Sequence, residues 1–310
     1  MEKVTFMMMV GLPGSGKSRA AAEYAKKYDA NIHSSDDIRE EIFKNVNDQK
    51  HNSEVFEILH NRVKEDIKNG KACIYDATNI SYKRRLAFLQ EIRGFARRND
   101  INLEAICILM CTPVEFCFKW NKQRKRKVPF EVIDRMYKSF DVPYWYEGWD
   151  NIFLHYPMEG FINYYGDINT YIVNQLDYDQ KNSHHKLSLG WHLEYAKNQI
   201  HYDEVVSAAA ALHDCGKPYC CTFVNAKGNR SDEAHYYNHE KVGAYMALFF
   251  NDFQTGFSSF GKLDIAAIIR WHMQPYFMSE KDFEAKYKQK LGIELFNNVL
   301  KVHKADVAAH

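Results

Sequence analysis

The stretch GLPGSGKS, residues 11–18, constrains the fold of this 310-residue chain more than any other feature. It fits the pattern G-x-x-x-x-G-K-[ST], follows the apolar run TFMMMV and precedes the helical pattern SRAAAEYAKKY. In such a loop glycines let backbone N–H groups curl around phosphate oxygens, the lysine reaches the transferring phosphate, and the serine hydroxyl ligates Mg²⁺. A glycine turn before a helix is the structural alternative. We expect ATP and Mg²⁺ to bind at Gly11, Gly14, Ser15, Gly16, Lys17 and Ser18.

The order of apolar segments predicts two domains. Strand-like runs lie at 5–10, 30–32, 72–76, 103–110 and 151–156, with helical patterns between them. This alternation predicts a parallel sheet wrapped by helices. Apolar residues at helical spacing dominate at 203–214, 240–250, 262–273 and 293–309. We therefore expect an α/β P-loop kinase domain over 1–157, an all-α domain over 183–310, and a linker or the start of the second domain at 158–182.

Charge and cysteine content indicate the kind of substrate and the cellular compartment. The net charge is +1, but residues 1–150 carry 26 Lys and Arg against 22 Asp and Glu. This excess favours an anionic substrate for the first domain. The seven cysteines form no C-x-x-C pair, which is typical of reduced thiols in a cytosol-like compartment. With no apparent signal peptide or membrane span, a soluble cytoplasmic protein with no membrane partner is expected.

A carboxylate for the kinase chemistry is expected after the second strand, in HSSDDIRE. Asp36 at a strand's carboxyl end could accept the proton of an attacking hydroxyl. Arg39, one helical turn further on, could clamp an anionic group of the acceptor. The alternative is that Asp36 or Asp37 caps the following helix.

The third strand ends in YDATN, which brings more polar groups to the same region. Asp76, Thr78 and Asn79 would point into the crevice beyond the strand ends, where ligands bind in parallel sheets. They are interpreted as substrate-binding residues. A polar turn that caps the next helix is the alternative.

A basic segment, KWNKQRKRKVP, follows the fourth strand. Six of the nine residues from Lys119 to Lys127 are Lys or Arg. A solvated helix end would explain such a run, but beside an ATP loop its arginines can form a lid that closes on phosphates. Arg124 is the expected catalytic arginine and Arg126 a further ATP contact.

Over about residues 1–157 the chain resembles the 5′-hydroxyl kinase module of the polynucleotide kinase family. The shared elements are GLPGSGKS, SSDDIR, DATN followed by RRLAF, and N-x-x-R-x-x-x-VP with the following FEVIDRMYKSF. The resemblance implies that Asp36 is the general base, that Arg39 binds the acceptor phosphate, and that Arg124 is the lid arginine. Trp120 stands where the family usually has an arginine, a place that Lys119 or Arg126 would have to fill.

Ten of the fourteen histidines follow residue 183. Taken singly, each is more readily explained as a structural or exposed residue than as a ligand. A metal site needs imidazoles and carboxylates from several elements. The candidates are spread along the apolar helical segments in the order H…HD…H…H…D, at His192, His213, Asp214, His239, His272 and Asp306.

That order, with HHKLSLGWH, ALHDCGKP and H-E-x-x-G-A, resembles the HD superfamily of metal-dependent phosphohydrolases over 183–310. The resemblance implies His192, His213, Asp214 and Asp306 as core ligands of one or two divalent ions, with a transition metal favoured. His239 and His272 would bind a second metal or the phosphate, and Lys217 would contact the substrate phosphate. The other histidines of this half (184, 185, 201, 235, 303 and 310) are interpreted as surface residues or as residues behind the ligands, with His185 the first exception to consider.

Together the two modules indicate nucleic-acid end healing. A 5′-hydroxyl kinase joined to a 3′-phosphatase or 2′,3′-phosphoesterase would prepare cleaved ends, RNA being favoured, for an RNA ligase of the same pathway. One alternative is a small-nucleotide or nucleoside kinase with a nucleotidase or phosphodiesterase. Another is a kinase whose helical domain is regulatory and non-catalytic.

Overall fold

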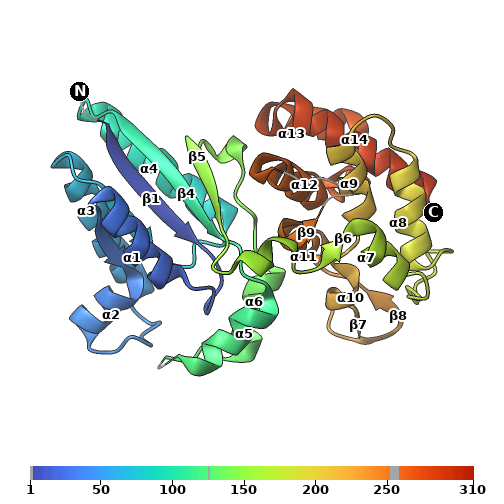
Figure 1. Ribbon diagram of the computed structural model, residues 1–310, viewed down its shortest axis with the longest axis horizontal. Helices are drawn as coiled ribbons and strands as arrows, with labels where there is room; N and C mark the ends of the chain where they lie inside the picture. Colours follow the sequence, from blue (N-terminus) through green and yellow to red (C-terminus); the bar gives the residue numbers. More distant parts are fainter. Residues whose placement is uncertain (1–2, 125, 252–257) are drawn as a thin grey trace. The chain divides into compact units, whose positions relative to one another are not determined.

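The computed structural model describes residues 3–124, 126–251 and 258–310, and it divides into two compact units (Figure 1). Unit 1 comprises Met1–Ile133 and Pro143–Pro157, and unit 2 comprises Asp134–Val142 and Met158–His310. The segment 134–142 therefore groups with the helical unit, although the sequence boundaries placed it in the first domain. Its aromatic residues explain this, because Tyr137 and Phe140 are buried with ring centroids 5.5 and 4.8 Å from that of Tyr245.

Unit 1 is built on a five-stranded parallel sheet with the strand order β2-β3-β1-β4-β5. The strands are β1 (Val4–Val10), β2 (Asn31–Ser34), β3 (Cys73–Asp76), β4 (Leu103–Met110) and β5 (Asn151–His155). The expected parallel α/β fold is thereby confirmed. Since all five strands run the same way, the segments that follow β1, β2 and β3 emerge at one edge of the sheet.

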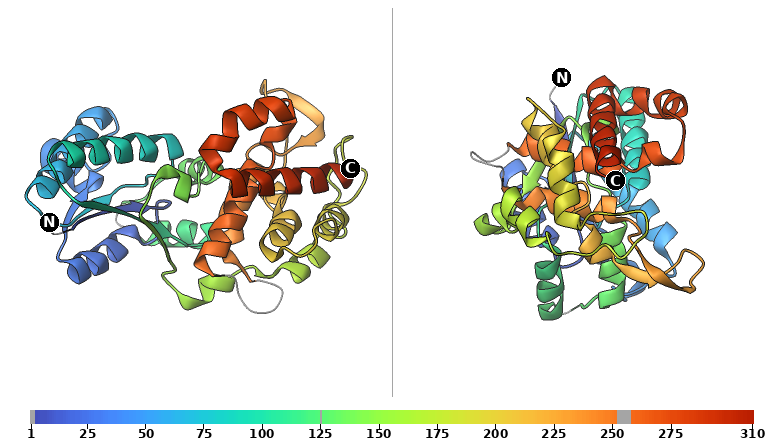
Figure 2. Two further views of the ribbon diagram at one scale, coloured as in Figure 1. Left: turned by 90° about the horizontal axis from the view of Figure 1, so that it is seen from above. Right: turned by 90° about the vertical axis from the view of Figure 1, so that its right-hand side faces the viewer.

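Helices alternate with these strands along the chain, and the last helix before β5 passes from unit 1 into unit 2. They are α1 (Lys17–Tyr28), α2 (Ser35–Phe43), α3 (Asn52–Lys68), α4 (Tyr82–Arg98), α5 (Val114–Gln123) and α6 (Phe130–Lys138), with a 3₁₀ turn η1 (Trp145–Glu147). Figure 2 shows α1 on one side of the sheet and α3 and α4 on the other. Central strand β1 is buried on both sides, so Met7 and Met9 pack toward α1 while Phe6 contacts Phe88 of α4. A strand that is buried on both faces is typically a continuous apolar run, as FMMMV within TFMMMV is.

Unit 2 is mainly helical. Its helices are α7 (Ile168–Asn174), α8 (Leu189–Asn198), α9 (Glu204–Leu212), α10 (Lys217–Cys220), α11 (His239–Met246), α12 (Ser259–Trp271), α13 (Glu280–Leu291) and α14 (Ile293–Ala308), with short 3₁₀ turns η2 (Glu159–Asn163), η3 (Ala247–Phe249) and η4 (Gln274–Phe277). Helix α9 lies against α8, α12 and α14, and its run Ala208–Ala211 is completely buried. Small side chains allow close helix approach on several sides, so α9 forms the centre of the unit.

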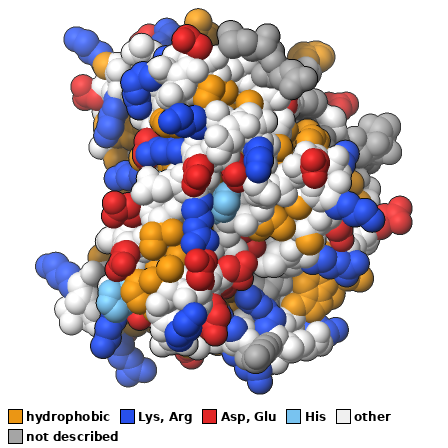
Figure 3. All heavy atoms as spheres, turned by 90° about the vertical axis from the view of Figure 1, so that its left-hand side faces the viewer, with side chains coloured by type: hydrophobic (Ala, Val, Ile, Leu, Met, Phe, Trp, Pro, Cys, Tyr) orange, Lys and Arg blue, Asp and Glu red, His pale blue; other side chains and the backbone are white. Residues whose placement is uncertain are grey.

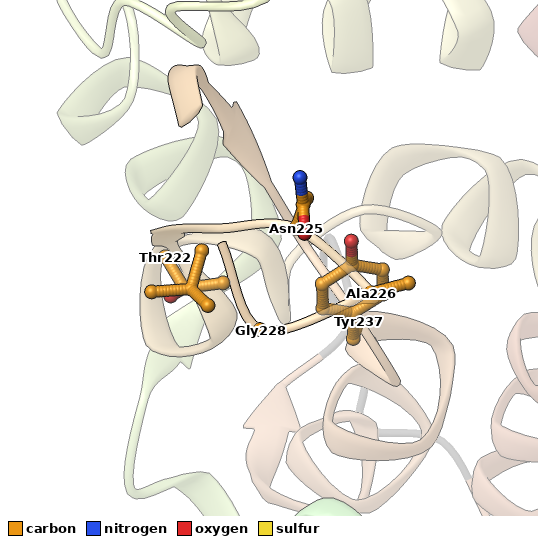
Figure 4. Close-up of a pocket in the computed structure, with 6 residues that line it drawn as sticks. Thr222, Asn225, Ala226, Gly228 and Tyr237 are labelled. Atoms are coloured by element: carbon orange, nitrogen blue, oxygen red, sulfur yellow. The ribbon is translucent and has the colours of Figure 1, made fainter. Parts of the chain in front are cut away.

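The expectation of an all-α second domain is wrong in one respect, because unit 2 also holds short strands. These are the antiparallel pair β7 (Thr222–Val224) and β8 (Arg230–His235), and the two-residue parallel pair β6 (Gly166–Asp167) and β9 (Phe250–Asn251). The hairpin is largely exposed and polar, so it has no alternation of apolar residues for a sequence pattern to show. Its turn lines a shallow surface hollow with Thr222, Val224, Asn225, Ala226, Gly228 and Tyr237 (Figure 4).

Two surface properties accompany this fold. Within the described part of the chain, no helix combines the length and the apolar character that a bilayer crossing requires. On the face drawn in Figure 3, Lys and Arg side chains are interspersed with Asp and Glu. This mixture agrees with the net charge of +1.

Candidate active sites

The phosphate loop of unit 1 joins β1 to α1 and depends on glycine. Gly14 and Gly16 have φ angles of 82° and 89°, in the left-handed region. A Cβ at Gly14 would also lie 2.3 Å from the carbonyl oxygen of Cys117, so no other residue fits there. The hydroxyl of Thr112 donates to the carbonyl of Ser15 at 2.9 Å and fixes the loop from the end of β4. The loop is thus held in its phosphate-binding curve by backbone geometry.

The two polar side chains that open α1 have partners within the site. Lys17 Nζ donates to the carbonyl of Leu12 at 2.8 Å, across the loop. Ser18 Oγ donates to Asp76 Oδ2 at 3.1 Å, at the carboxyl end of β3. Burial lowers the pKa of Lys17, which Asp76 partly offsets, and the charges of Arg124 and Asp36 also act on this ammonium. Burial raises the pKa of Asp76, while Lys17 and Ser18 oppose that effect. Residues from four separate segments therefore gather around Lys17.

The Asp36 side chain does not cap α2. Ser34 Oγ accepts hydrogen bonds from the backbone N–H groups of Asp36 and Asp37, at 3.2 and 3.3 Å, so the cap of this helix is Ser34 and neither aspartate. The Asp36 carboxylate instead forms ion pairs with Arg39, at 3.2 Å, and with Arg126 of the basic segment. Asp36 is therefore a partly exposed carboxylate at the edge of the sheet, between two arginines.

Arg39 is buried, and its guanidinium is engaged inside the protein. It donates to the carbonyls of Asp48 and Ser35 at 2.9 and 3.1 Å, and to Asn52 Oδ1 at 2.7 Å, besides Asp36. These bonds anchor the segment between α2 and α3 and orient the Asp36 carboxylate. Arg126, whose other partner is Asn47 Oδ1 at 3.1 Å, lies in the more exposed segment.

The DATN turn supports the phosphate loop through its backbone. Asn79 Nδ2 donates to the carbonyl of Met9 at 2.8 Å, and the carbonyl of Thr78 accepts from Gly11 N–H at 3.0 Å. Arg85 is buried in an ion pair with Glu147, with N–O distances of 2.6 and 2.8 Å, and also donates to the carbonyl of Asn79. Sequence reasoning missed this pair, because Arg85 fits the polar face of an amphipathic pattern. Of the three candidates in DATN, only the Asp76 side chain bonds to a candidate ATP·Mg²⁺ residue.

The basic segment starts in the last turns of α5 and continues beyond its end at Gln123, and Asn121 holds this second part in place. Its side chain donates to the carbonyl of Val128 at 2.8 Å and accepts from Val128 N–H at 3.0 Å, which closes the segment into a loop. Lys125 lies outside the described residues. The ring of Trp120 packs on Phe116 and reaches to within about 4 Å of the position a Cβ would take on Gly16. An indole therefore stands beside the phosphate loop, at the position where the resemblance would have placed an arginine.

In unit 2 the six predicted ligands converge. Side-chain atoms of His192, His213, Asp214 and Asp306 lie within 4.8 Å of one another, and Asp214 also groups with His239 and His272. The shortest contacts join His192 Nε2 to His213 Nε2 at 3.0 Å and to Asp306 Oδ1 at 3.1 Å. Asp214 places one oxygen in each group, since Oδ2 is 3.3 Å from His192 Nε2 and Oδ1 is 3.1 Å from His239 Nε2. All six residues are buried.

Close packing of backbones makes this convergence possible. His213 and His272 follow the last turns of α9 and α12, and His239 opens α11. A Cβ at Gly216 would lie 2.2 Å from the carbonyl oxygen of His239, so glycine there lets the segment after Asp214 approach α11. The HDCG tetrapeptide thus carries the packing requirement and the ligands together.

The histidines are oriented as metal ligands are. The Nδ1 atoms of His213, His239 and His272 each lie 2.7 to 2.8 Å from a backbone carbonyl oxygen, to which Nδ1–H donates. In a neutral imidazole this leaves the lone pair on Nε2, directed into the cluster. The Nε2 atoms of His239 and His272 and Oδ1 of Asp306 are buried and form no well-directed hydrogen bond among the described residues, although His239 Nε2 and Asp306 Oδ1 each have an ion-pair contact at 3.1 Å. Buried ligand atoms that face one another in this way fit one or two divalent cations, and N/O ligands suit a transition metal.

The electrostatics of the cluster agree with this fit. Burial would raise the pKa of Asp214, but Lys217 and His213 hold it well below its usual range. Burial would lower the pKa of His213, but Asp214 and Asp306 raise it to about 10, so a proton occupies Nε2 when no cation does. Burial lowers the pKa of His272 to about 3, which keeps that imidazole neutral. The two carboxylates therefore favour the binding of positive charge at the centre of the cluster, whether a proton or a cation.

Two further histidines border the cluster. Lys217 Nζ donates to Asp214 Oδ2 at 2.6 Å, to Gln180 Oε1 at 2.8 Å and to His185 Nε2 at 3.1 Å. His310 Nδ1 donates to the carbonyl of His184 at 3.0 Å, and its Nε2 lies 3.4 Å from Asp306 Oδ1. Sequence reasoning set both His185 and His310 apart from the ligand set, since no spacing links them to it.

Comparison with known proteins concerns about half of the chain. Residues 6–143 match the family model of an AAA domain. The L-seryl-tRNA(Sec) kinase of Methanococcus maripaludis is 29% identical over 149 residues, which cover 46% of this chain and 55% of that kinase. The N-terminal unit is an α/β domain with a parallel sheet that fits a P-loop kinase. The chain spans about half the length of this curated relative.

Two solved structures of an RNA repair assembly also resemble part of the chain. A structure of the Pnkp1/Rnl/Hen1 RNA repair complex aligns with 23% identity and a TM-score of 0.37, covering 44% of this chain and 43% of that one. A second structure of the Pnkp1/Rnl/Hen1 complex aligns with 23% identity and a TM-score of 0.32, covering 41% of each chain. These scores are too low to support a functional inference.

Proposed function

We propose that the chain is a bifunctional nucleic-acid end-healing enzyme. Unit 1 would transfer the γ-phosphate of ATP to a 5′-hydroxyl, and unit 2 would act as an HD-type, metal-dependent 3′-phosphatase or 2′,3′-phosphoesterase. The observation that carries the proposal is the convergence of six buried ligands in unit 2, in a chain whose unit 1 holds a complete phosphate loop. RNA is the favoured substrate, because a relative of the kinase half is by name a tRNA kinase.

In the kinase step, four residues of the unit 1 site have distinct roles. The acceptor oxygen attacks the γ-phosphorus, the bond from that phosphorus to the β,γ-bridging oxygen breaks, and ADP leaves. Asp36 takes the proton of the acceptor hydroxyl. Lys17 exchanges the Leu12 carbonyl for phosphate oxygens, and Ser18 together with Asp76 is placed to hold Mg²⁺. This moves Asp76 from the expected acceptor site to the metal side.

Three arginines have the remaining roles in the kinase step. Arg39 is buried, so its task is to orient Asp36 and thereby the acceptor hydroxyl. Arg126, paired with Asp36 from an exposed segment, is free to exchange this carboxylate for a phosphate of ATP or of the acceptor. Arg124 acts electrostatically on Lys17 and is placed to neutralise charge on the transferring group.

In unit 2 the six ligands would hold one or two divalent cations. A bound divalent metal lowers the pKa of a water molecule and polarises the P–O bond. Water then forms the new bond to phosphorus, the ester P–O bond breaks, and the leaving oxygen takes up a proton. Backbone carbonyls keep the imidazoles in the ligating tautomer, and burial of the cluster excludes bulk water. Tyr276 donates to Asp306 Oδ2 at 2.9 Å and fixes that carboxylate.

An acceptor comparison tests the kinase half. The protein is incubated with labelled ATP and either a short RNA with a 5′-hydroxyl, the matching DNA, or free nucleosides. We expect the RNA to be labelled, and Asp36→Asn to reduce labelling by about 10²- to 10⁴-fold, as loss of a general base does. Labelling of nucleosides alone would contradict the end-healing function and favour the small-nucleotide alternative. The free cysteines of the described structure suit the cytoplasmic setting in which an RNA ligase would follow.

A further inference from the structure

We propose that His185 contacts the substrate phosphate in the C-terminal site, and that this substrate is a phosphomonoester. The proposal deepens the hydrolase half of the proposed function and rests on it. It begins from Lys217, the residue expected from sequence to bind the phosphate. An ammonium group has three N–H donors and no acceptor. In this structure Asp214, Gln180 and His185 already receive all three.

The contact with Lys217 fixes the tautomer of His185. Because the ammonium can only donate, Nε2 of His185 accepts, and the ring proton of a neutral imidazole must then sit on Nδ1. The Nδ1 atom of His185 is buried, with no hydrogen-bond partner among the described residues. A buried N–H donor without an acceptor costs free energy unless a ligand supplies one.

The position of His185 next to the ligand cluster indicates which ligand that is. Its ring centroid lies 5.6 Å from that of His192, a member of the cluster, and 4.5 Å from that of His310. His310 donates to the carbonyl of His184, so it holds the peptide next to His185 in place. His185 is half-buried, and the His310 side chain is 29% exposed, whereas that of His192 is 1% exposed. The edge of the cluster formed by His185 and His310 is therefore less buried than its centre, and it is the side from which we expect a substrate to approach.

The chemistry of the site selects among phosphate esters. His185 and His310 belong to neither group of converging ligand atoms, so a hydrogen bond from Nδ1 of His185 would add to the bonds that a metal makes to the phosphate. A terminal phosphomonoester has three non-bridging oxygens and a diester has two. The extra donor therefore favours a 3′-phosphate over a 2′,3′-cyclic phosphate. Lys217 acts as a positioning residue that holds His185.

Three substitutions of His185 separate donation from positioning. An Asn side chain can place N–H near Nδ1, a Gln side chain places its amide near Nε2, and Ala removes both. We expect His185→Asn to bind inorganic phosphate better than His185→Gln or His185→Ala, each of which should lose about 10- to 100-fold in affinity, the effect of one hydrogen bond to a charged group. Binding is measured by titration calorimetry on metal-loaded full-length protein. His201→Asn, at an exposed position, is the matched control.

Two more measurements decide the outcome. Metal content of each variant should equal that of the wild type. The ratio of 3′-phosphate to 2′,3′-cyclic phosphate hydrolysis should fall at least tenfold in His185→Ala. Equal losses on both esters, loss of metal in His185→Ala, or better phosphate binding by Gln than by Asn would overturn the role of His185. A wild type that binds neither metal nor phosphate would instead overturn the hydrolase function on which that role rests.

Discussion

The phosphate loop of unit 1 and the histidine–aspartate cluster of unit 2 both suit phosphate chemistry, but they are made of different parts. The loop is eight consecutive residues that would meet phosphate with backbone N–H groups, and Lys17 and Ser18 complete it. The cluster contains side chains alone, from residues spread between His192 and Asp306. The loop is one continuous segment supported by a few backbone contacts, whereas the cluster exists only when five helices have packed.

This difference has a physical consequence. Substitutions in the loop should alter one contact at a time, because the backbone that surrounds phosphate stays in place. In the cluster each carboxylate is shared by several partners, so that one change disturbs the whole charge balance.

Asp214→Asn should have the largest effect. Asp214 contributes one oxygen to each of the two ligand groups and holds Lys217, so the amide removes the charge that both depend on. We expect loss of metal and a fall in phosphoester hydrolysis of about 10³-fold or more, since bound metal contributes several kcal/mol to such reactions. Metal analysis and hydrolysis assays measure this, with Asp232→Asn on exposed β8 as the control. Retention of full metal content would show that the cluster is not a metal site.

Lys17→Met should have the next largest effect and should be confined to the kinase. The substitution removes the ammonium but leaves the loop backbone and the Ser18–Asp76 contact intact. Transfer from ATP should fall about 10²- to 10³-fold, as loss of one electrostatic contact in a transition state does, while hydrolysis is unchanged. Lys26→Met, on the exposed face of α1, controls for the loss of charge. A parallel fall in hydrolysis would mean that the two activities share one site.

Two arginines that pair with Asp36 should respond in opposite ways. Arg126→Ala should lower phosphoryl transfer about tenfold with little change in the free energy of unfolding, because its segment is exposed. Arg39→Ala should lower the free energy of unfolding by about 2 to 4 kcal/mol, because it leaves buried acceptors unpaired. Urea denaturation beside kinase assays separates the two. A stable Arg39→Ala protein with normal folding but no acceptor binding would return Arg39 to the role expected from sequence.

The smallest effect concerns the segment that joins unit 2 from the end of α6. Asp141 pairs with Lys241 at 3.1 Å and Arg270 at 2.9 Å. Burial would raise the pKa of Asp141, but these two cations hold it below its usual range. A carboxyl group whose pKa is lower in the folded state stabilises the protein above its unfolded pKa, and this stabilisation is lost as the pH falls through the folded value. Asp141→Asn should therefore cost about 2 kcal/mol at pH 7.

The pH dependence checks the cause of that loss. The difference between wild type and Asp141→Asn in the free energy of unfolding should be constant between pH 5 and pH 8, and it should shrink below about pH 4. Urea denaturation at a series of pH values measures it. An equal difference at pH 3 and pH 7 would indicate lost packing rather than lost charge.

Sequence foretold the two candidate sites to different degrees. The phosphate loop and the parallel sheet follow from local patterns, whereas the six converging residues are expected only from the order H…HD…H…H…D and its resemblance to a known superfamily. Ser34 as the cap of α2 could be recognised only from the structure, since SSDD offers four capping residues in a row. The Arg85–Glu147 pair joins residues 62 positions apart, with no signal in either neighbourhood.

The same limit applies to the second unit. Sequence marks His185 only as the first exception among the unassigned histidines, and its importance depends on the bonds that Lys217 makes after folding. The segment 134–142 looks like a continuation of the kinase module, and only its buried aromatic contacts assign it to the helical unit. A sequence pattern shows which face of an element is buried, but it does not show which other element covers that face.

One measurement tests most directly whether this chain holds two independent active sites. A single RNA with a 5′-hydroxyl and a 3′-phosphate is incubated with ATP and the wild type, Lys17→Met or Asp214→Asn, and the products are resolved by mass spectrometry. We predict that the wild type changes both ends, that Lys17→Met removes only the 3′-phosphate, and that Asp214→Asn adds only the 5′-phosphate. A wild type that leaves the 3′ end unchanged, or a single substitution that stops both reactions in a folded protein, would contradict it.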